Sequence, residues 1–570
     1  MRKMLSLLVL IAGLWPAVRV GAQTPLDKRQ VLMQAMVEEM NRSLRELRVE
    51  DFEPPYFLAM ECKEESQLML GARYGAITID DHNRRRILRS EVRVGSYQFD
   101  NIGEKGEEYD FSDTPTYFPD TLGPLDDDAV ALRNALWLMT DSAYKAALKN
   151  YLKRKSKKIT EVEDGKKKES FSREKPNRDI QPPRDLSLNL DYWRQLVRQL
   201  SAEFEHHPRI FDSSVSFEAK KFERLLVNSE GSRLISNQTI YSLTVFGATR
   251  APDGLLLRHS RTIHAQREKG LPDKEKAIEL VRQVAKNLED LCQAPVLEPY
   301  TGPAILDGEA TGVLFHEVIG HRLEGERQLD EREGKTFKEQ IGRQIIPDFL
   351  SVFDDPTMKE LGGEELNGHY AYDDEGVAAQ RVVLIDHGVL KNFLLSRTPV
   401  EGFANSNGHG RAAAGKKPRA RMAVTMVKSD REVPYARLKE MLLEEVKRQN
   451  KPYGLIIKNI VGGSTHTYTW GYQAYKGVPE MVYRVYPDGR EELVRGVEIV
   501  GTPIASINKI VATSNNYKVF NGFCGAESGY VPVSTYAPDV LMTEIELQRK
   551  MQLQEKPPIL PSPWTGKIEK

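Results

Sequence analysis

Residues 316–321 read His316-Glu-Val-Ile-Gly-His321, and no other stretch constrains the chain as strongly. The segment around them opens helix-like at Gly308, after a strand-like stretch at 303–306. Two imidazoles and a carboxylate this close together are the parts of a hydrolytic zinc site, because imidazole nitrogens bind the metal and a carboxylate that is not a ligand can act as a base. The sequence therefore predicts a helix that carries metal ligands.

The spacing of the two histidines is unusual. The common motif His-Glu-x-x-His places them four residues apart on one helix face, whereas here they are five apart. On an ideal helix five residues span about 500°, which turns the rings roughly 140° away from each other. A local π-type turn would bring them back into phase, and Gly320 is where a helix deforms most easily. The spacing alone leaves open a helix with one buried and one surface histidine.

The stretch at 312–325 is similar to the signature of the TldD family of the TldD/PmbA metallopeptidases, which carries His-Glu-x-x-x-His. Further matches follow in the family's order at 372–376, 419–422, 454–463, 522–525 and 531–533. The resemblance covers about 301–547 well and the preceding part more loosely. It implies zinc ligands at His316, His321 and Cys524. The chain departs from the family pattern at Arg322, where a glycine is usual, and at Glu326, where an aspartate is usual.

Two histidines and one cysteine leave a fourth position open, which is typical of catalytic rather than structural zinc. Glu317 adjoins a ligand but lies one step around the helix, which suits a general base. We therefore expect a zinc-dependent peptidase that hydrolyses peptide bonds through a metal-activated water. The alternative without a catalytic site is that Glu317 is an ordinary helix-surface carboxylate and Cys524 a thiol of the hydrophobic core.

The resemblance also implies properties that reach beyond the motif. It implies short or unfolded peptides as substrates, held in extended form, and a dimer. The dimer is either a homodimer or a heterodimer with a PmbA-like subunit, which lacks the metal motif. The alternative function is a non-hydrolytic, zinc-containing peptide-binding or assembly subunit that acts with such a partner.

Three further residues are candidates for substrate binding. Gly463 belongs to a glycine pair where backbone could approach a substrate, and His466 could stabilise an oxyanion or have no role. Arg421 could bind a substrate carboxylate or pair with the acids at 373–375. Those acids could orient groups near the metal or form a solvated turn.

Residues 1–22 have a basic start and an apolar run too short for a bilayer span. We expect a cleaved signal peptide ending near Ala22 and an exported, periplasmic or secreted protein. The alternative is an amphipathic or buried N-terminal helix. No later stretch is apolar enough to span a membrane. Cleavage would remove three basic residues and move the net charge from −1 to −4, which gives no reason to expect nucleic acid as a partner.

The expected fold class is α+β, with a mixed α/β N-terminal region and a β-rich, curved or barrel-like antiparallel C-terminal domain that carries the motif helix. We expect an N-terminal domain at 23–120, a middle region at 121–296, a metallopeptidase domain at 297–550 and a tail at 551–570. Within the middle region, 153–183 should be an exposed charged linker or an extended surface helix.

Finer predictions concern strands, turns and cysteines. Strands at 56–62, 69–79 and 87–99 should be separated by polar turns, with the arginines at 84–86 in a turn or on a solvated edge. His387 should be a turn residue and not a ligand. With Cys524 on the metal, Cys62 and Cys292 remain as a disulfide or as two buried free thiols.

Overall fold

The computed structural model describes most of the chain beyond its first 26 residues. The described residues are 27–49, 52–102, 121–160, 169–186, 188–329, 333–465, 467, 475–501, 503–550, 555, 558, 560 and 563. The predicted signal peptide, residues 1–22, lies outside them, as does most of the tail at 551–570. Within the described ranges, no helix combines the length and the apolar character needed to cross a bilayer.

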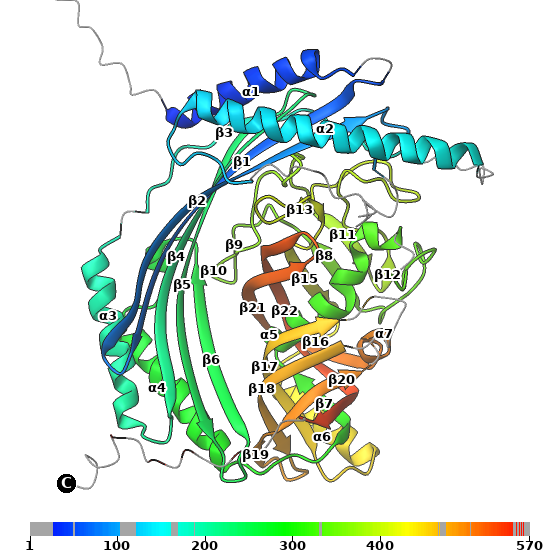
Figure 1. Cartoon of the computed structure of the whole chain (residues 1–570). Coiled ribbons are helices and arrows are strands. Elements are labelled where there is room, and N and C mark those ends of the chain that lie inside the picture. Colours follow the sequence, from blue (N-terminus) through cyan, green and yellow to red (C-terminus); the bar gives the residue numbers. More distant parts are fainter. Residues whose placement is uncertain are drawn as a thin grey trace, which may run out of the picture.

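The N-terminal part of the chain forms a long curved sheet whose inner side faces the C-terminal domain (Figure 1). The strands run in the order β2-β1-β4-β5-β3, and β6 also pairs with β5. All pairs are antiparallel except β3 with β5. The strands are β1 (Pro55–Arg73), β2 (Ala76–Val94), β3 (Arg178–Ile180), β4 (Asp212–Asn228), β5 (Arg233–Arg250) and β6 (Leu256–Ala265).

Two pairs of helices cover the two ends of this sheet. The apolar faces of α1 and α2 pack on the first half of β1, and those of α3 and α4 pack on its second half. Each pair therefore closes a separate hydrophobic core. The helices are α1 (Lys28–Glu46), α2 (Ala129–Thr160), α3 (Leu190–Ala202) and α4 (Lys274–Gln293), with the short 3-10 helices η1 (Glu203–His206) and η2 (Glu268–Gly270).

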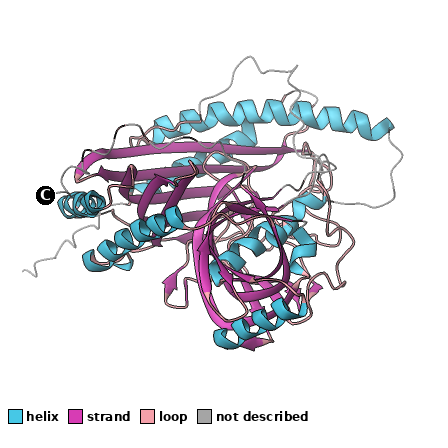
Figure 2. Ribbon diagram, turned by 90° about the horizontal axis from the view of Figure 1, so that it is seen from below, coloured by secondary structure: helices cyan, strands magenta, loops and turns pink. Residues whose placement is uncertain are grey.

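The C-terminal domain is built on a sheet that closes on itself. The closed path runs β22-β20-β18-β17-β7 and back to β22, and only the β17–β7 pair in it is parallel. Figure 2 looks along this barrel, where the strands form a ring. The ring strands are β7 (Tyr300–Leu306), β17 (Gly454–Thr465), β18 (Tyr475–Val485), β20 (Val497–Gly501) and β22 (Gly529–Arg549). The predicted fold class is confirmed.

Further strands extend the barrel sheet or form small pairs beside it. One of them, β21, forms a long hairpin with β22. The helix α5 packs against β17, β21 and β22, which places it on the barrel. The remaining elements are α5 (Gly308–Phe315), α6 (Tyr435–Arg448), α7 (Pro503–Ile507), η5 (Gly325–Gln328), β8 (Leu350–Asp354), β9 (Glu360–Leu361), β10 (Glu364–Glu365), β11 (Val382–Asp386), β12 (Val389–Leu390), β13 (Gly410–Arg411), β14 (Arg419–Ala420), β15 (Val424–Ser429), β16 (Glu432–Val433), β19 (Glu491–Val494) and β21 (Ile510–Ala526).

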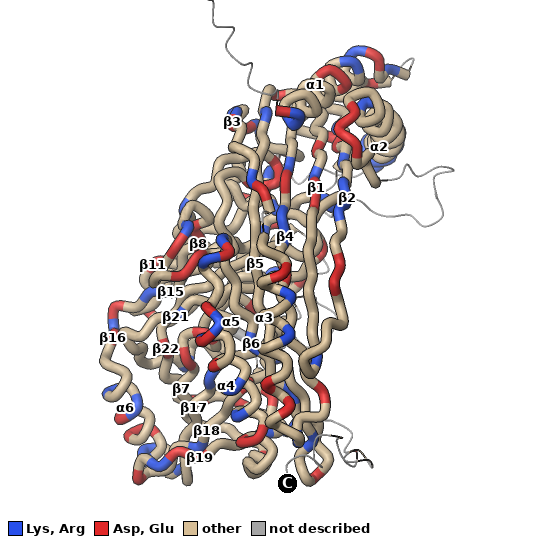
Figure 3. The backbone as a smooth tube through the Cα atoms, turned by 90° about the vertical axis from the view of Figure 1, so that its left-hand side faces the viewer, with Lys and Arg blue, Asp and Glu red and all other residues tan. Residues whose placement is uncertain are grey.

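The prediction of two short strands before residue 80 is wrong. The polar stretch at 63–67, which we expected to be a turn, lies in the middle of β1. Its acids are paired across the sheet with the arginines of β2, Glu64 with Arg86 and Glu65 with Arg85. Figure 3 shows basic and acidic residues interspersed along these strands. Opposite charges that face each other across two strands stabilise the pair. The polar sequence of one strand, taken alone, suggests a turn instead.

The arginines at 84–86 do lie on an edge strand, but only part of the cluster is solvated. Arg86 is buried and binds Glu64 and Asp127, whereas Arg84 and Arg85 are exposed. The predicted linker at 153–183 also splits. Residues 153–160 continue α2, as the surface-helix alternative expects, and 161–168 lie outside the described residues. Phe171 and β3 pack into the fold, so the rest is not a linker.

Two small predictions are settled by the fold. His387 occupies the tight turn between β11 and β12 with a φ of 47°, as expected, and it is exposed. Cys62 and Cys292 are free thiols in separate hydrophobic cores, so the disulfide alternative is wrong.

Candidate metal centre

The motif helix changes its winding where the first histidine begins. Asp307 caps α5 by accepting a hydrogen bond from the Ala310 backbone N–H, so the helix begins at Gly308. From His316 to Gly320 the chain forms a π-helix, η3 (His316–Gly320), and the N–H of His321 donates to the carbonyl of His316. A 3-10 turn, η4 (His321–Leu323), follows. The predicted π-type turn is confirmed, and it brings the two histidines onto one side.

Close packing explains why glycines occupy two positions of this helix. A Cβ atom on Gly320 would lie 1.9 Å from the Met422 sulfur, and one on Gly312 would lie 2.1 Å from the hydroxyl oxygen of Thr535 on β22. Neither distance is possible for real atoms. The helix therefore approaches the barrel more closely than any larger residue at these positions would allow.

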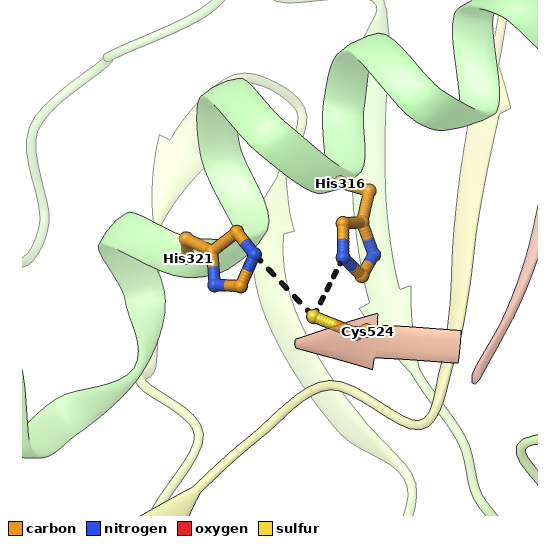
Figure 4. A group of neighbouring side chains, drawn as sticks. All are labelled: His316, His321 and Cys524. Carbon is orange, nitrogen blue, oxygen red and sulfur yellow. Dashed lines mark hydrogen bonds between the residues drawn. The ribbon is translucent and has the colours of Figure 1, made fainter. Parts of the chain in front are cut away.

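The third residue of the group comes from the distant hairpin strand β21. The Cys524 Sγ lies 3.1 Å from Nε2 of His316 and 3.4 Å from Nε2 of His321 (Figure 4). The three residues are 7%, 6% and 5% exposed, and their potential ligand atoms all lie within 4.8 Å of one another. The structure thus brings together the three residues predicted as zinc ligands.

Glu324 orients one of the two imidazoles. Its Oε1 lies 3.0 Å from Nδ1 of His321, which leaves Nε2 turned toward the sulfur of Cys524. Burial would raise the pKa of Glu324, but His321 and Arg327 hold it well below the usual range of a carboxyl group. A carboxylate behind a ligating histidine is a common feature of metal sites. Sequence reasoning missed this residue, although a glutamate three positions after a candidate ligand was a usable signal.

The electrostatics of the group suit a cation. Burial would raise the pKa of the Cys524 thiol, but His321 and His316 lower it well below its usual value. Burial would likewise lower the pKa of His321, but Cys524 and Glu324 raise it well above its usual value. The two imidazoles therefore favour the thiolate form of the sulfur, which is the form that binds zinc. Two imidazole nitrogens and one thiolate are a donor set that fits this metal.

Glu317 lines the same cavity as the three ligating residues. The cavity measures about 430 Å³, and the end of β17, residues 461–465, forms part of its wall. A Cβ atom on Gly463 would lie 2.6 Å from Cγ of Glu317, so only glycine leaves this carboxylate its place. Gly463 therefore lies at the site as predicted, and its role in substrate binding stays a prediction. His466 lies outside the described residues.

Arg322, which departs from the family pattern, supports the π-turn. Its guanidinium donates to the backbone carbonyls of Glu317 and Val318 and to the Thr465 hydroxyl. Carbonyls at the end of a helix lack intrahelical donors, so this contact supplies a partner for two of them. Burial, with a further contribution from Arg327, lowers the pKa of Arg322 to about 10.

The prediction that Arg421 binds a substrate carboxylate or pairs with the acids at 373–375 is wrong. Arg421 is 1% exposed, and its guanidinium donates to the carbonyls of Cys524 and Gly529 and to the Ser528 hydroxyl. These contacts hold the tip of the β21–β22 hairpin. Arg421 thus positions the strand that carries Cys524 and is not available to a ligand.

Both interpretations of the acids at 373–375 are also wrong. Asp373 is 1% exposed, and its carboxylate accepts hydrogen bonds from the backbone N–H groups of Glu375, Val377 and Gly410. Asp374 pairs with Arg224 of the N-terminal sheet. Neither belongs to the metal-ligating group among the described residues. This loop joins the two halves of the molecule and is not a solvated turn.

A match to a known family falls on the domain that carries this centre, and matches to single relatives are longer than that domain. Residues 299–549 match the family model described as the PmbA/TldA metallopeptidase C-terminal domain. A metalloprotease of Methanocaldococcus jannaschii is 28% identical over 326 residues, which cover 57% of this chain and 67% of that protein. A zinc metalloprotease TldD homologue of Saccharolobus solfataricus is 26% identical over 353 residues, 60% of this chain and 72% of that protein.

A solved structure shares the fold over almost the whole chain. The crystal structure of TldE from Thermococcus kodakarensis superposes with a TM-score of 0.60 and covers 90% of this chain and 100% of that chain. At 12% sequence identity the likeness concerns the fold alone. The shared fold includes both the C-terminal barrel and the N-terminal sheet.

Proposed function

Because the chain belongs to the TldD/PmbA metallopeptidase family, we propose that it is a zinc-dependent peptidase that hydrolyses short or unfolded peptides. One observation carries the proposal. Nitrogens of His316 and His321 and the sulfur of Cys524 converge from two distant segments, with the Glu317 carboxylate in the wall of the same cavity. Three ligands with a base beside them are the arrangement of catalytic rather than structural zinc sites.

The residues around the centre have separable tasks. A zinc ion held by the two imidazoles and the thiolate would supply Lewis acidity toward a water molecule and a peptide carbonyl. Glu324 fixes the tautomer and the direction of the His321 ring. Glu317 takes the proton of the attacking water on its carboxylate and returns it to the leaving amine. Arg421 keeps the Cys524 strand in place.

The proposal includes the setting in which the enzyme acts. We propose a dimer, formed with a second copy or with a PmbA-like subunit, and the fold likeness to TldE supports a partner of this architecture. We also propose that the protein is exported, on the basis of the sequence of residues 1–22.

Zinc content and turnover of a peptide test the function together. We expect about one zinc per chain in the parent protein, a clear loss in Cys524→Ser, and no loss in Cys292→Ser. The last variant is a matched control, because Cys292 is also a buried thiol but lies in a different hydrophobic core from Cys524. Its Sγ donates a hydrogen bond to the Arg250 carbonyl, and a serine hydroxyl can keep this bond.

Glu317→Gln separates metal binding from chemistry. This variant should keep its zinc and lose about 10²- to 10⁴-fold in kcat, the usual contribution of a general base. Cleavage at the parental rate would show that Glu317 is not the base. A parent protein that binds zinc and peptide but turns over no peptide would favour the non-hydrolytic binding subunit.

A further inference from the structure

Three cavities meet at Phe523, the residue before Cys524 on β21. The first is the metal cavity. The second, of about 420 Å³, shares Tyr530 with it, and Tyr530 pairs with Gly525 beside the hairpin tip. The third, of about 650 Å³, shares Phe520 with the metal cavity, on the other side of Cys524 along the strand. The metal cavity is therefore flanked on both sides along β21.

The second cavity, here the cation-rich cavity, lies between the N-terminal sheet and the barrel. Five Lys or Arg side chains line it, against three Asp or Glu. All three acids are engaged within the protein. Glu65 pairs with Arg85, Asp374 pairs with Arg224, and Asp373 accepts three backbone N–H groups. None of these carboxylates remains to balance further positive charge.

Two cations of this cavity are left without a protein partner. Arg184 and Lys359 are exposed, and neither forms an ion pair or a side-chain hydrogen bond with any residue the structure describes. Both act on His369 in the cavity wall, since burial lowers the pKa of this histidine and Lys359 and Arg184 lower it further. Both positive charges therefore lie close enough to the cavity wall to act on a group within it.

The third cavity, here the carboxylate-rich cavity, has the opposite imbalance. Four glutamates line it, against two arginines. Arg261 and Arg267 are each paired with one of the glutamates. Glu360 on β9 and Glu364 on β10 are exposed and have no ion-pair partner in the described part of the chain. Burial and the nearby Glu309 raise the pKa of Glu364, and Arg261, which is paired with Glu309, offsets only part of this rise.

We propose that this charge asymmetry sets the direction of the bound peptide, with its carboxyl-terminal end in the cation-rich cavity and its amino-terminal end toward the carboxylate-rich cavity. The inference rests on the proposed function, because it takes the metal cavity between them as the place of cleavage. A peptide with free ends carries a positive amino terminus and a negative carboxyl terminus. Unpaired charges of opposite sign on the two sides of the metal therefore complement one direction and oppose the other.

Binding of one neutral peptide in three forms tests the direction. The forms have free ends, an amidated carboxyl terminus, or an acetylated amino terminus. The full-length Glu317→Gln protein, loaded with zinc, serves as the parent, so that affinity is measured without turnover. We expect each blocked form to bind about 10-fold more weakly, the scale of one or two partly exposed charge contacts. The difference should shrink at high salt.

The double variant Arg184→Gln and Lys359→Gln assigns the carboxylate contact. In it, amidation should no longer weaken binding, while acetylation should weaken it as before. Lys391→Gln, which changes an exposed lysine directly after β12 and outside the three cavities, should keep both effects. An amidated peptide with glutamate as its last residue tests whether the cavity binds a side-chain carboxylate as well as the chain terminus. If this peptide binds the parent as tightly as the peptide with free ends, the side-chain carboxylate can make the contact.

Two results would overturn the inference. One is equal affinity of the free and amidated peptides for the parent, and the other is an amidation effect that survives in the double variant. Because the measurement needs no hydrolysis, a failure of peptide cleavage by the unmutated protein would count against the proposed function alone.

Discussion

The barrel and the N-terminal sheet use buried charge in opposite ways. At the metal centre the ionisable groups of His316, His321 and Cys524 converge on one point and leave a position for a cation. Where the sheet meets the barrel domain, buried arginines are paired with acids of the protein, as in Arg224 with Asp374 and Arg397 with Glu230. The charges of the metal centre are balanced only when a cation binds, whereas the ion pairs at the boundary are balanced within the protein. Damage to the centre should therefore appear as lost zinc, and damage to the boundary as lost stability.

The largest effect is expected at the boundary, from Arg224→Met. Arg224 bridges the Asp374 carboxylate and the backbone carbonyls of Tyr372 and Asp373, and its side chain is 6% exposed. Methionine would remove the ion-pair partner of this buried acid and leave it the Ala412 backbone N–H and the nearby Lys63, so we expect a loss of about 3 kcal/mol in the free energy of unfolding, the lower end for breaking a buried pair. Urea denaturation measures this change.

Zinc affinity should stay at the parental value in folded Arg224→Met protein. Arg194→Met, which removes an exposed pair with Asp80, is the control and should leave the unfolding curve unchanged. If Arg224→Met were as stable as the parent, or if it lost zinc while still folded, the division between the two regions would be wrong.

The next effect belongs to the centre, from Glu324→Gln. Glutamine lacks the negative charge that attracts the Nδ1–H group of His321. The ring is then held less strongly in the orientation that turns Nε2 toward Cys524 and the metal position. Zinc affinity should fall by about 10- to 100-fold, as for other residues behind a ligand. Competition with a chelator measures it. Glu309→Gln, at the start of the same helix and paired with Arg261, should bind zinc as the parent does. Equal affinities in the two variants would remove Glu324 from the centre.

The same contrast explains what the sequence could predict. The spacing of the motif and Gly320 identified the π-turn as one of two alternatives, because both act within one helix, but they left open a helix with one buried and one surface histidine. Cys524 lies 203 residues after His321 and entered only through the family resemblance. The Arg224 to Asp374 pair joins segments 150 residues apart, and neither residue carries a local signal. In β1, Glu64 and Glu65 were assigned to a turn because their partners lie on another strand. Short-range patterns therefore predicted the residues of the motif helix better than the ion pairs between the N-terminal sheet and the C-terminal domain.

His264 lies where the two regions touch and gives the smallest expected effect. Its ring contacts Phe523 edge-on and Ser242 by a hydrogen bond, and burial, with Lys220, lowers its pKa to about 4. The unfolded chain has a histidine pKa near 6.5, so it binds more protons than the folded protein between these values. The stability that neutral His264 contributes is therefore present above about pH 6.5 and lost as the pH falls toward 4.

His264→Gln should remove this pH dependence. Between pH 7 and pH 5, the parent should lose about 1–2 kcal/mol more of its free energy of unfolding than the variant does. Urea denaturation of both proteins at the two pH values isolates this term, because the other titrating groups are common to both. Parallel losses would mean that His264 has the same pKa in the folded protein as in the unfolded chain, so that it is protonated in the folded protein at pH 5. At pH 5 a charged imidazole of the sheet would then contact Phe523 of the β21–β22 hairpin. The contact between the two regions would not be neutral and apolar.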